Sequence, residues 1–193
     1  SCMFSACESL TQLDLSKFDT SHVIDMRKMF YGCYRLLKLN ISNFDTSSVV
    51  NMLGMFSDCV SLTQLDLSSF DTSAVISMSC MFSACESLTQ LDLSNFDTDI
   101  VTNMNSMFYD CKALTQLDIS NFNTHNVDDT RWMFEHCEKL TTIYISNKWS
   151  MDRVTNAMDM FKECYSLPGF SPEKTGIEMA KPTEQEGYLT LKK

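Results

Sequence analysis

Cysteine is the residue whose number and spacing first suggest chemistry in this chain. Of the nine cysteines, seven recur every 26 residues, with a last step of 27: Cys7, Cys33, Cys59, Cys85, Cys111, Cys137 and Cys164. Regular thiols can ligate zinc, but the chain has no Cys-x-x-Cys and no histidine at ligand spacing. Disulfide geometry is demanding, and an intact ladder offers no obvious pairing. We therefore expect buried free thiols that pack as small hydrophobic side chains.

Two cysteines lie outside this ladder. Cys2 and Cys80 share a repeat position that is occupied in other units by different residues: Lys28, Gly54, Ser106 and Trp132. Such variety predicts exposure to solvent. For Cys80 this leaves two interpretations open, an ordinary exposed side chain or a reactive or dimerising thiol.

The residue patterns of enzyme active sites are missing from this sequence. His22, His125 and His136 have no fixed register beside a nucleophile. The chain has no glycine-rich phosphate loop and no Gly-x-Ser-x-Gly. We therefore expect no catalytic residues, no metal site and no cofactor.

Aspartate is the most regular polar residue on the predicted strands. One column of outward positions contains four of them: Asp14, Asp66, Asp92 and Asp118. Asn40 and Tyr144 interrupt the column. Carboxylates about 4.8 Å apart repel by roughly 1 kcal/mol in bulk water, so the surroundings have to tolerate this cost. Three interpretations are open: a solvated structural ladder, a contact face for a protein or glycan, or a calcium site, for which one column supplies too few oxygens.

A second candidate surface breaks the repetition. The second unit carries a basic and aromatic cluster in an otherwise acidic chain: Arg27, Lys28, Tyr31, Tyr34, Arg35 and Lys38. Arg131, Trp132 and Tyr144 form a smaller group near the other end. Tyr, Trp and Arg dominate interface hot spots, which makes these residues candidate contacts. Sequence drift at solvated positions explains them equally well.

Both candidate surfaces depend on a 26-residue repeat, which residues 62–87 illustrate. Leu65 and Leu67 flank Asp66, and this alternation predicts a short strand with the leucines inward. Further apolar residues recur at steps of three and four, which predicts a short helix: Val75, Met78, Met81, Phe82 and Cys85. Residues 71–73, Asp-Thr-Ser, supply a turn and a helix N-cap. A second short strand around Val75 stays open.

A unit this small cannot bury its apolar face alone, but stacked units can. A partial unit is followed by six complete ones, which is above the roughly three that stability requires. We predict an α/β leucine-rich-repeat solenoid over residues 1–167, with one short parallel strand and one short helix per 26-residue coil. Residues 168–193 are expected to cap the last coil or to form a disordered tail.

The repeat resembles a known bacterial family. The sequence Leu-Thr-Gln-Leu-Asp-Leu-Ser-Asn-Phe-Asp-Thr at 88–98, with Met-Phe-x-x-Cys, is similar to the bacterial surface protein 26-residue repeat, a relative of the BspA-type leucine-rich repeats. The resemblance implies an exported cell-surface protein, in some members an adhesin, and it does not imply an enzyme or a cofactor. Phe70 and its equivalents stand where many leucine-rich repeats have an asparagine ladder. Asparagines one position earlier are expected to take over part of that role: Asn43, Asn95, Asn121 and Asn147.

Charge and hydropathy narrow the function. The formal net charge of -10 argues against nucleic-acid binding, because such binding depends on Lys and Arg side chains that neutralise phosphates. No apolar run approaches 18 residues, so we expect no membrane insertion in this segment, and we expect any signal and anchor to lie outside it. The sequence favours an extracellular, adhesin-like module that binds a host or matrix protein or a glycan. The alternative is a spacer that projects another domain from the bacterial surface.

Overall fold

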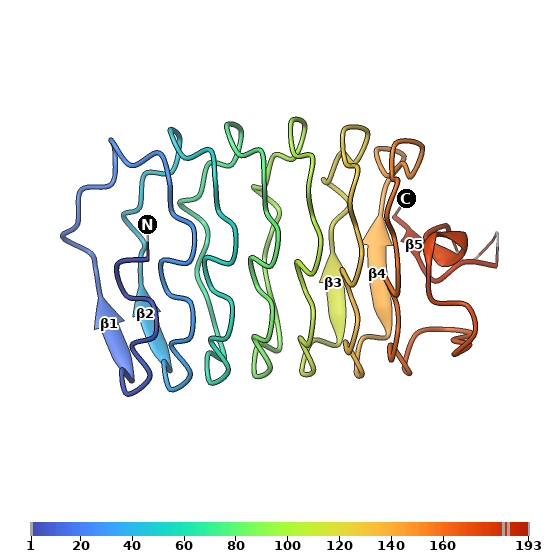
Figure 1. Cartoon of the computed structure of the whole chain (residues 1–193), viewed down its shortest axis with the longest axis horizontal. Coiled ribbons are helices and arrows are strands. Elements are labelled where there is room, and N and C mark those ends of the chain that lie inside the picture. Colours follow the sequence, from blue (N-terminus) through green and yellow to red (C-terminus); the bar gives the residue numbers. More distant parts are fainter. Residues whose placement is uncertain (1, 183, 185, 193) are drawn as a thin grey trace.

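The computed structural model describes residues 2–182, 184 and 186–192. Residues 1, 183, 185 and 193, which belong to the expected solenoid and tail, lie outside the described residues. The chain forms an elongated stack of coils, each one repeat long, with the first coil at one end and the C-terminal segment at the other (Figure 1). Its strands are short: β1 (Gln12–Asp14), β2 (Lys38–Asn40), β3 (Gln116–Asp118), β4 (Thr142–Ile145) and β5 (Thr190–Leu191).

The strands form two separate parallel sheets, β1-β2 and β3-β4-β5. Segments 64–66 and 90–92 hold the strand position of the two coils in between, and no backbone hydrogen bond joins them to a neighbouring coil. The predicted parallel strand is therefore present at both ends of the stack, and the expectation of one in every coil is wrong in the middle. Other contacts, on the opposite side of each coil, hold the middle coils together.

The predicted helix in each coil is wrong, because the described residues contain no α-helix. The one helical element is a 3-10 turn, η1 (Ile177–Met179), in the C-terminal segment. Residues after the strand form successive β-turns instead: the amides of Met55 and Cys59 donate to the carbonyls three residues back, at 3.1 and 3.2 Å. The third residues of these turns, Gly54 and Asp58, have φ of +58° and +61°, as in type II turns.

The amides that a helix would need are used between coils. In the coil that contains residues 52–58, four alternate amides donate to carbonyls of the next coil: Met52 to Ser77, Gly54 to Ser79, Phe56 to Met81 and Asp58 to Ser83, at 2.8–3.2 Å. The same pattern repeats along the stack. We call this side, formed by 24–32, 50–58, 76–84, 102–110 and 128–136, the ladder face. The open question of a second strand is answered by single-residue parallel bridges on this face, such as Asn51 to Ser77.

The core is a stack of phenyl rings with a parallel row of thiols. Seven rings stack with centroids 5.5–5.8 Å apart: Phe4, Phe30, Phe56, Phe82, Phe108, Phe134 and Phe161. From Cys33 onward, each thiol of the ladder donates to a phenylalanine carbonyl of the previous coil, as Cys85 does to Phe56 at 3.2 Å. All nine cysteines are free, and the expected burial is confirmed for six of the seven ladder thiols, since Cys7 in the first coil is only half-buried. Burial raises the pKa of the Cys137 thiol to about 12.

We predict that a thiol reagent will separate the cysteines into two groups. In the native protein the reagent should modify Cys2, Cys80 and, more slowly, the half-buried Cys7. The six buried thiols should react only after denaturation, because they are inaccessible and burial disfavours the thiolate. Ellman's reagent with and without guanidinium counts both groups. Fast native reaction of more than three thiols would contradict the buried ladder.

Buried threonines and less buried asparagines connect the coils on the remaining sides. Thr72, 1% exposed, donates its hydroxyl proton to the Asp97 carbonyl at 2.7 Å and accepts the Asp97 amide at 2.8 Å. The expected role of the asparagines is confirmed for three of them, which donate to carbonyls of the previous coil: Asn43, Asn95 and Asn121. These side chains supply inter-coil bonds where strand pairing is missing.

The C-terminal segment covers the last coil. Tyr188 meets the last ring of the stack, Phe161, edge to face at a centroid distance of 5.4 Å. Its buried hydroxyl donates to the Lys174 carbonyl at 3.0 Å and accepts the Ser171 amide at 2.8 Å. β5 extends the sheet by pairing with β4. None of the helices among the described residues has the length and hydropathy to cross a bilayer.

Candidate binding surfaces

The outward side chains of the strand position form the first candidate surface, which we call the strand face (12–14, 38–40, 64–66, 90–92, 116–118 and 142–145). Its four predicted aspartates are exposed, and each accepts the amide of the serine two residues later at 3.0 Å: Asp14, Asp66, Asp92 and Asp118. An aspartate that accepts this bond closes an Asx turn. Every carboxylate of the column therefore supports its own backbone, and one oxygen of each is engaged.

The same contacts explain how the column tolerates its charge. At Asp66 the hydroxyl and the amide of Ser68 lower the pKa of the carboxyl below its ordinary value. At Asp118 burial acts in the opposite direction, but hydrogen bonds from Lys192 and Ser120 lower its pKa. The column is therefore ionised at neutral pH. Serine donors offset the repulsion that the sequence analysis identified.

Grooves open along the strand face, and two of them lie at the middle coils, where the sheet is interrupted. One, of about 300 Å³, is lined by 65–68 together with Asp92, Ser94 and Asn95. The next, of about 280 Å³, is lined by 91–94 together with Asp118, Asn121 and Lys192 among others. A larger one, of about 420 Å³, is lined by residues that include Gln90, Gln116 and Tyr144. The aspartates of the middle coils, Asp66, Asp92 and Asp118, therefore line these grooves.

One carboxylate of the column is already paired. The ammonium group of Lys192, from the end of the C-terminal segment, lies 2.5 Å from Asp118 Oδ2. Asp118 also faces Tyr144 as its register partner between β3 and β4, so two of the predicted site residues come together. Asp14 lies apart from them, in β1, where it lines a groove with Lys38 of β2.

The basic and aromatic cluster is not brought together as one site. Lys28 lies over the Tyr31 ring at 5.2 Å on the ladder face. Arg27, on the same face, pairs with Asp25 at 2.9 Å. Its other members lie elsewhere: Lys38 is in β2 on the strand face, and Tyr34 and Arg35 are in the exposed segment before it.

The smaller C-terminal group is divided in the same way. Arg131 lies over the Trp132 ring at 5.4 Å and pairs with Asp129 at 3.1 Å, both on the ladder face. Tyr144 is on the strand face. The candidate contact residues are therefore divided between the strand face and the ladder face.

A backbone requirement that the sequence analysis missed explains the variable position of Cys80. The residues at this position all have positive φ, between 53° and 58°: Cys2, Lys28, Gly54, Cys80, Ser106 and Trp132. The expected exposure is confirmed for Cys2 and Lys28, Cys80 and Trp132 are only half-buried, and the expectation is wrong for the buried Gly54 and Ser106. Gly54, and Gly32 at the repeat position of Asp58, could have indicated this requirement in the sequence, since glycine adopts a positive φ without strain.

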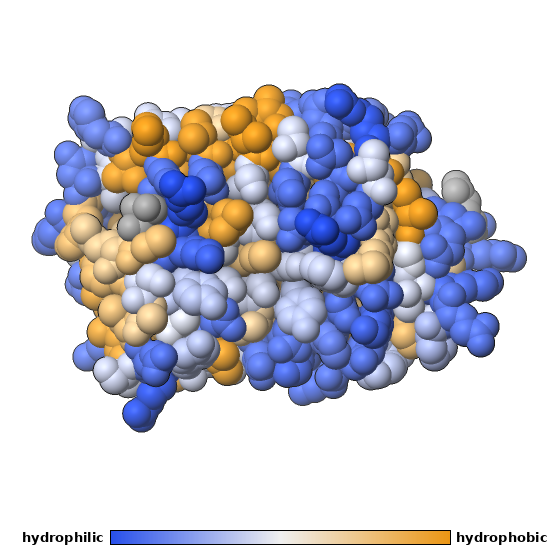
Figure 2. Space-filling model, in the orientation of Figure 1, coloured by the Kyte–Doolittle hydropathy of each residue, from blue (hydrophilic) through white to orange (hydrophobic). Residues whose placement is uncertain are grey.

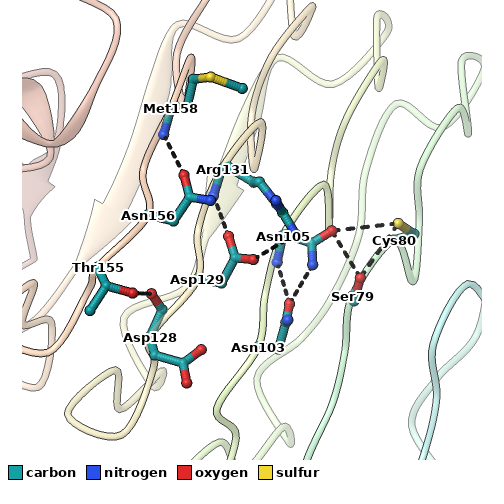
Figure 3. Close-up of polar contacts among 10 residues, drawn as sticks. All are labelled: Ser79, Cys80, Asn103, Asn105, Asp128, Asp129, Arg131, Thr155, Asn156 and Met158. Atoms are coloured by element: carbon teal, nitrogen blue, oxygen red, sulfur yellow. Dashed lines mark hydrogen bonds and ion pairs between the residues drawn. The ribbon is translucent and has the colours of Figure 1, made fainter.

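A row of hydrogen-bonded polar side chains lies on the ladder face beside Cys80 (Figure 3). Asn105 Oδ1 accepts the Ser79 hydroxyl at 3.0 Å, and Asn105 Nδ2 donates to Asn103 Oδ1 at 2.6 Å. Asn103 and Asp129 also accept amides two residues later, so they support turns as the strand-face aspartates do. Among the residues that the structure describes, no three His, Cys, Asp or Glu side chains are grouped as metal ligands.

Comparison with known proteins identifies the class of fold. The chain is similar to the T. pallidum leucine-rich repeat protein TpLRR, with a TM-score of 0.57 and 22% identity over 88% of this chain and 70% of that one. The fold is therefore a leucine-rich-repeat solenoid. The family described as "Mycoplasma protein of unknown function, DUF285" matches residues 1–92 and 88–169, and the chain belongs to it. A search of curated proteins gives no match.

Proposed function

We propose that this chain is a non-catalytic binding module, displayed on a bacterial surface, that recognises a protein or glycan carrying basic groups. The grooves of the strand face carry the proposal: Asp66 and Asp92 line open space, while Asp118 in the next groove binds an ammonium group from the chain itself. The resemblance to BspA-type surface repeats supports the adhesin-like role and the location. An ionised column would also attract basic partners over about a Debye length.

The rival proposal is a spacer that binds nothing. It is favoured by the turn-closing bonds, since each column aspartate has a structural role without any ligand. The two proposals differ in what happens when the charge is removed while the turn is kept.

The test is a triple variant, Asp66→Asn, Asp92→Asn and Asp118→Asn, which retains the Oδ1 acceptors. Wild-type and variant proteins are screened against immobilised matrix proteins, plasma proteins and glycans at low and physiological salt. We expect a saturable interaction that is weakened by salt and lost in the variant. Removing three carboxylate charges eliminates the attraction for a basic partner and leaves the Asx turns closed.

The matched control changes three aspartates of the neighbouring turns: Asp45→Asn, Asp71→Asn and Asp97→Asn. These exposed residues close the same kind of turn with the amides two residues later, at 2.9–3.0 Å. The control therefore has the same net charge as the test variant and should still bind. Binding that survives in the strand-face variant would direct attention to Arg27–Lys38 or Arg131–Tyr144. If the folded wild-type protein binds none of the immobilised partners, the result would favour the spacer proposal.

A further inference from the structure

Two grooves of the strand face are the same groove repeated one coil apart. The first is lined by seven residues: Leu65, Asp66, Leu67, Ser68, Asp92, Ser94 and Asn95. The second is lined by the residues 26 positions later, and every one of the seven keeps its residue type. The second groove has one further lining residue, Lys192 from the C-terminal segment. Its occupant therefore indicates what the first groove can bind.

Lys192 shows how an ammonium group enters such a groove. Its amide continues the pairing of β5 with β4 by donating to the Ile145 carbonyl at 2.8 Å. Its side chain crosses β4 and brings Nζ to 2.5 Å from Asp118 Oδ2 on β3. The surface at this end of the stack is mostly hydrophilic, as the right-hand end of Figure 2 shows. The two side chains stay 52% and 46% exposed, so attraction between the charges, not burial, holds the ammonium group there.

The hydrogen bonds of the carboxylates favour lysine over arginine. In Asp66 and Asp92, as in Asp118, Oδ1 accepts the amide of the serine two residues later at 3.0 Å. Each carboxylate therefore has Oδ2 available. An ammonium group can bind one oxygen, whereas a guanidinium group binds carboxylates best through two oxygens at once. The half-buried Leu65 and Leu91 add apolar surface along which lysine methylenes can lie.

The first groove has carboxylates but no cation from the described part of the chain. None of the ion pairs among the described residues includes Asp66 or Asp92. Hydrogen bonds from Ser68 and Ser94 lower the pKa of these two carboxyls, so both are charged at neutral pH. The first groove thus has the charge and the lining of the second without its occupant.

We propose that the groove between Asp66 and Asp92 is a lysine subsite, which takes the ammonium group of a protein partner as the next groove takes Lys192. This inference rests on the proposed binding function and names the group that the strand face recognises. Lys192 is then an internal competitor for the second subsite, because it occupies Asp118 from within the chain.

The spacing of the coils indicates the form of the partner. Phe56, Phe82 and Phe108 belong to the coils that carry the three aspartates, and their ring centroids are 5.8 Å apart. Parallel strands are about 4.8 Å apart where hydrogen bonds join them, as on the ladder face, so these coils diverge towards the strand face. Alternate residues of an extended peptide are about 6.7 Å apart. A Lys-x-Lys segment that lies along the stack therefore suits two adjacent grooves.

The first experiment maps where such a segment contacts the protein. The folded protein is mixed at low salt with an acetylated and amidated peptide, Thr-Lys-Thr-Lys-Thr, and a carbodiimide then couples amines to the carboxylates that they contact. Mass spectrometry of the digest locates the links. We expect the peptide at Asp66 and Asp92, and Lys192 coupled to Asp118. Coupling to Asp66 and Asp92 that does not exceed coupling to the turn aspartates of the control variant overturns the proposal.

The second experiment measures affinity by fluorescence anisotropy of the labelled peptide. Asp66→Asn should weaken binding by about two- to fivefold, because an exposed ion pair contributes modestly. Asp71→Asn, in the same coil, is the matched control and should bind as the wild type does. Lys192→Gln frees the second groove, so it should strengthen binding of the two-lysine peptide by a similar factor. The same peptide with arginine in place of lysine should bind less well.

The outcomes separate this inference from the proposed function. Equal affinity for the lysine and arginine peptides overturns the lysine subsite, and so does a Lys192→Gln protein that binds no better than the wild type. Neither result affects a partner found in the screen of immobilised proteins and glycans. Lysine-selective binding that Asp66→Asn weakens and Asp71→Asn does not would support the subsite even if that screen finds no partner.

Discussion

Replacing Phe82 by alanine is expected to lower the free energy of unfolding by about 3–5 kcal/mol. The ring is fully buried and stacks on Phe56 and Phe108, with centroids 5.8 Å away on each side. Alanine would leave a cavity in the middle of the phenyl stack, and the coils cannot close it because their backbones are joined on the ladder face. Urea denaturation followed by circular dichroism measures the loss.

A phenylalanine outside the buried stack provides the control. Phe18 is 41% exposed and touches only Phe4 among the aromatic rings, at a tilted 6.4 Å. Phe18→Ala removes the same atoms but leaves a site that water already reaches, so its cost should be clearly smaller. Equal losses for the two variants would mean that the phenyl stack has no special part in stability.

Replacing Thr72 by valine is expected to cost about 1–3 kcal/mol. Valine has nearly the same shape, so packing is preserved and the hydroxyl alone is lost. That hydroxyl satisfies both the carbonyl and the amide of Asp97, at 2.7 and 2.8 Å, and both groups would be left without this partner beside a buried side chain. The free energy of unfolding, measured as above, gives the cost.

Thr115→Val is the matched comparison. Thr115 is exposed, and its hydroxyl makes no hydrogen bond within the described part of the chain. We expect its replacement to be nearly neutral. A Thr72→Val protein as stable as Thr115→Val would show that the threonine row contributes nothing to the cohesion of the coils.

The 26-residue period predicted which side chains face inward, and the reason is physical. Stacking places equivalent residues in equivalent surroundings, so a position that is apolar in every coil, such as that of Phe82 or Cys85, is expected to face the core throughout the stack. This argument requires no knowledge of the backbone. The predicted burial of the thiols and phenyl rings is therefore correct, although the predicted helix that contained them is not formed.

The helix prediction failed because two conformations bury the same pattern. Steps of three and four residues bring side chains to one side of a helix, but a succession of β-turns also brings the first and fourth residues of each turn together. Backbone hydrogen bonds decide between them: the amide of Gly54 donates to the next coil, which removes a helical bond. Local sequence shows periodicity directly, whereas bonds to a neighbouring coil depend on the assembled stack.

The candidate site was predicted in part for a similar reason. Alternation around Asp66 correctly placed its side chain outward, and the turn-closing bond to Ser68 follows from neighbours in sequence. The contact of Lys192 with Asp118 joins positions far apart in the chain, and no local pattern indicates it. The basic residues of 27–38 are neighbours in sequence, but the coil places them on different faces.

The ladder of identical contacts makes whole repeats interchangeable. Each coil meets its neighbours only through residues about one unit away, so removing or adding a unit gives every remaining coil the kind of neighbour it had before. The sequence contains segments similar enough for such an exchange: residues 79–94 repeat residues 1–16 without a single difference. Recombination between such copies would shorten or lengthen the protein in steps of one or more complete coils and leave the reading frame, the core and both ends intact.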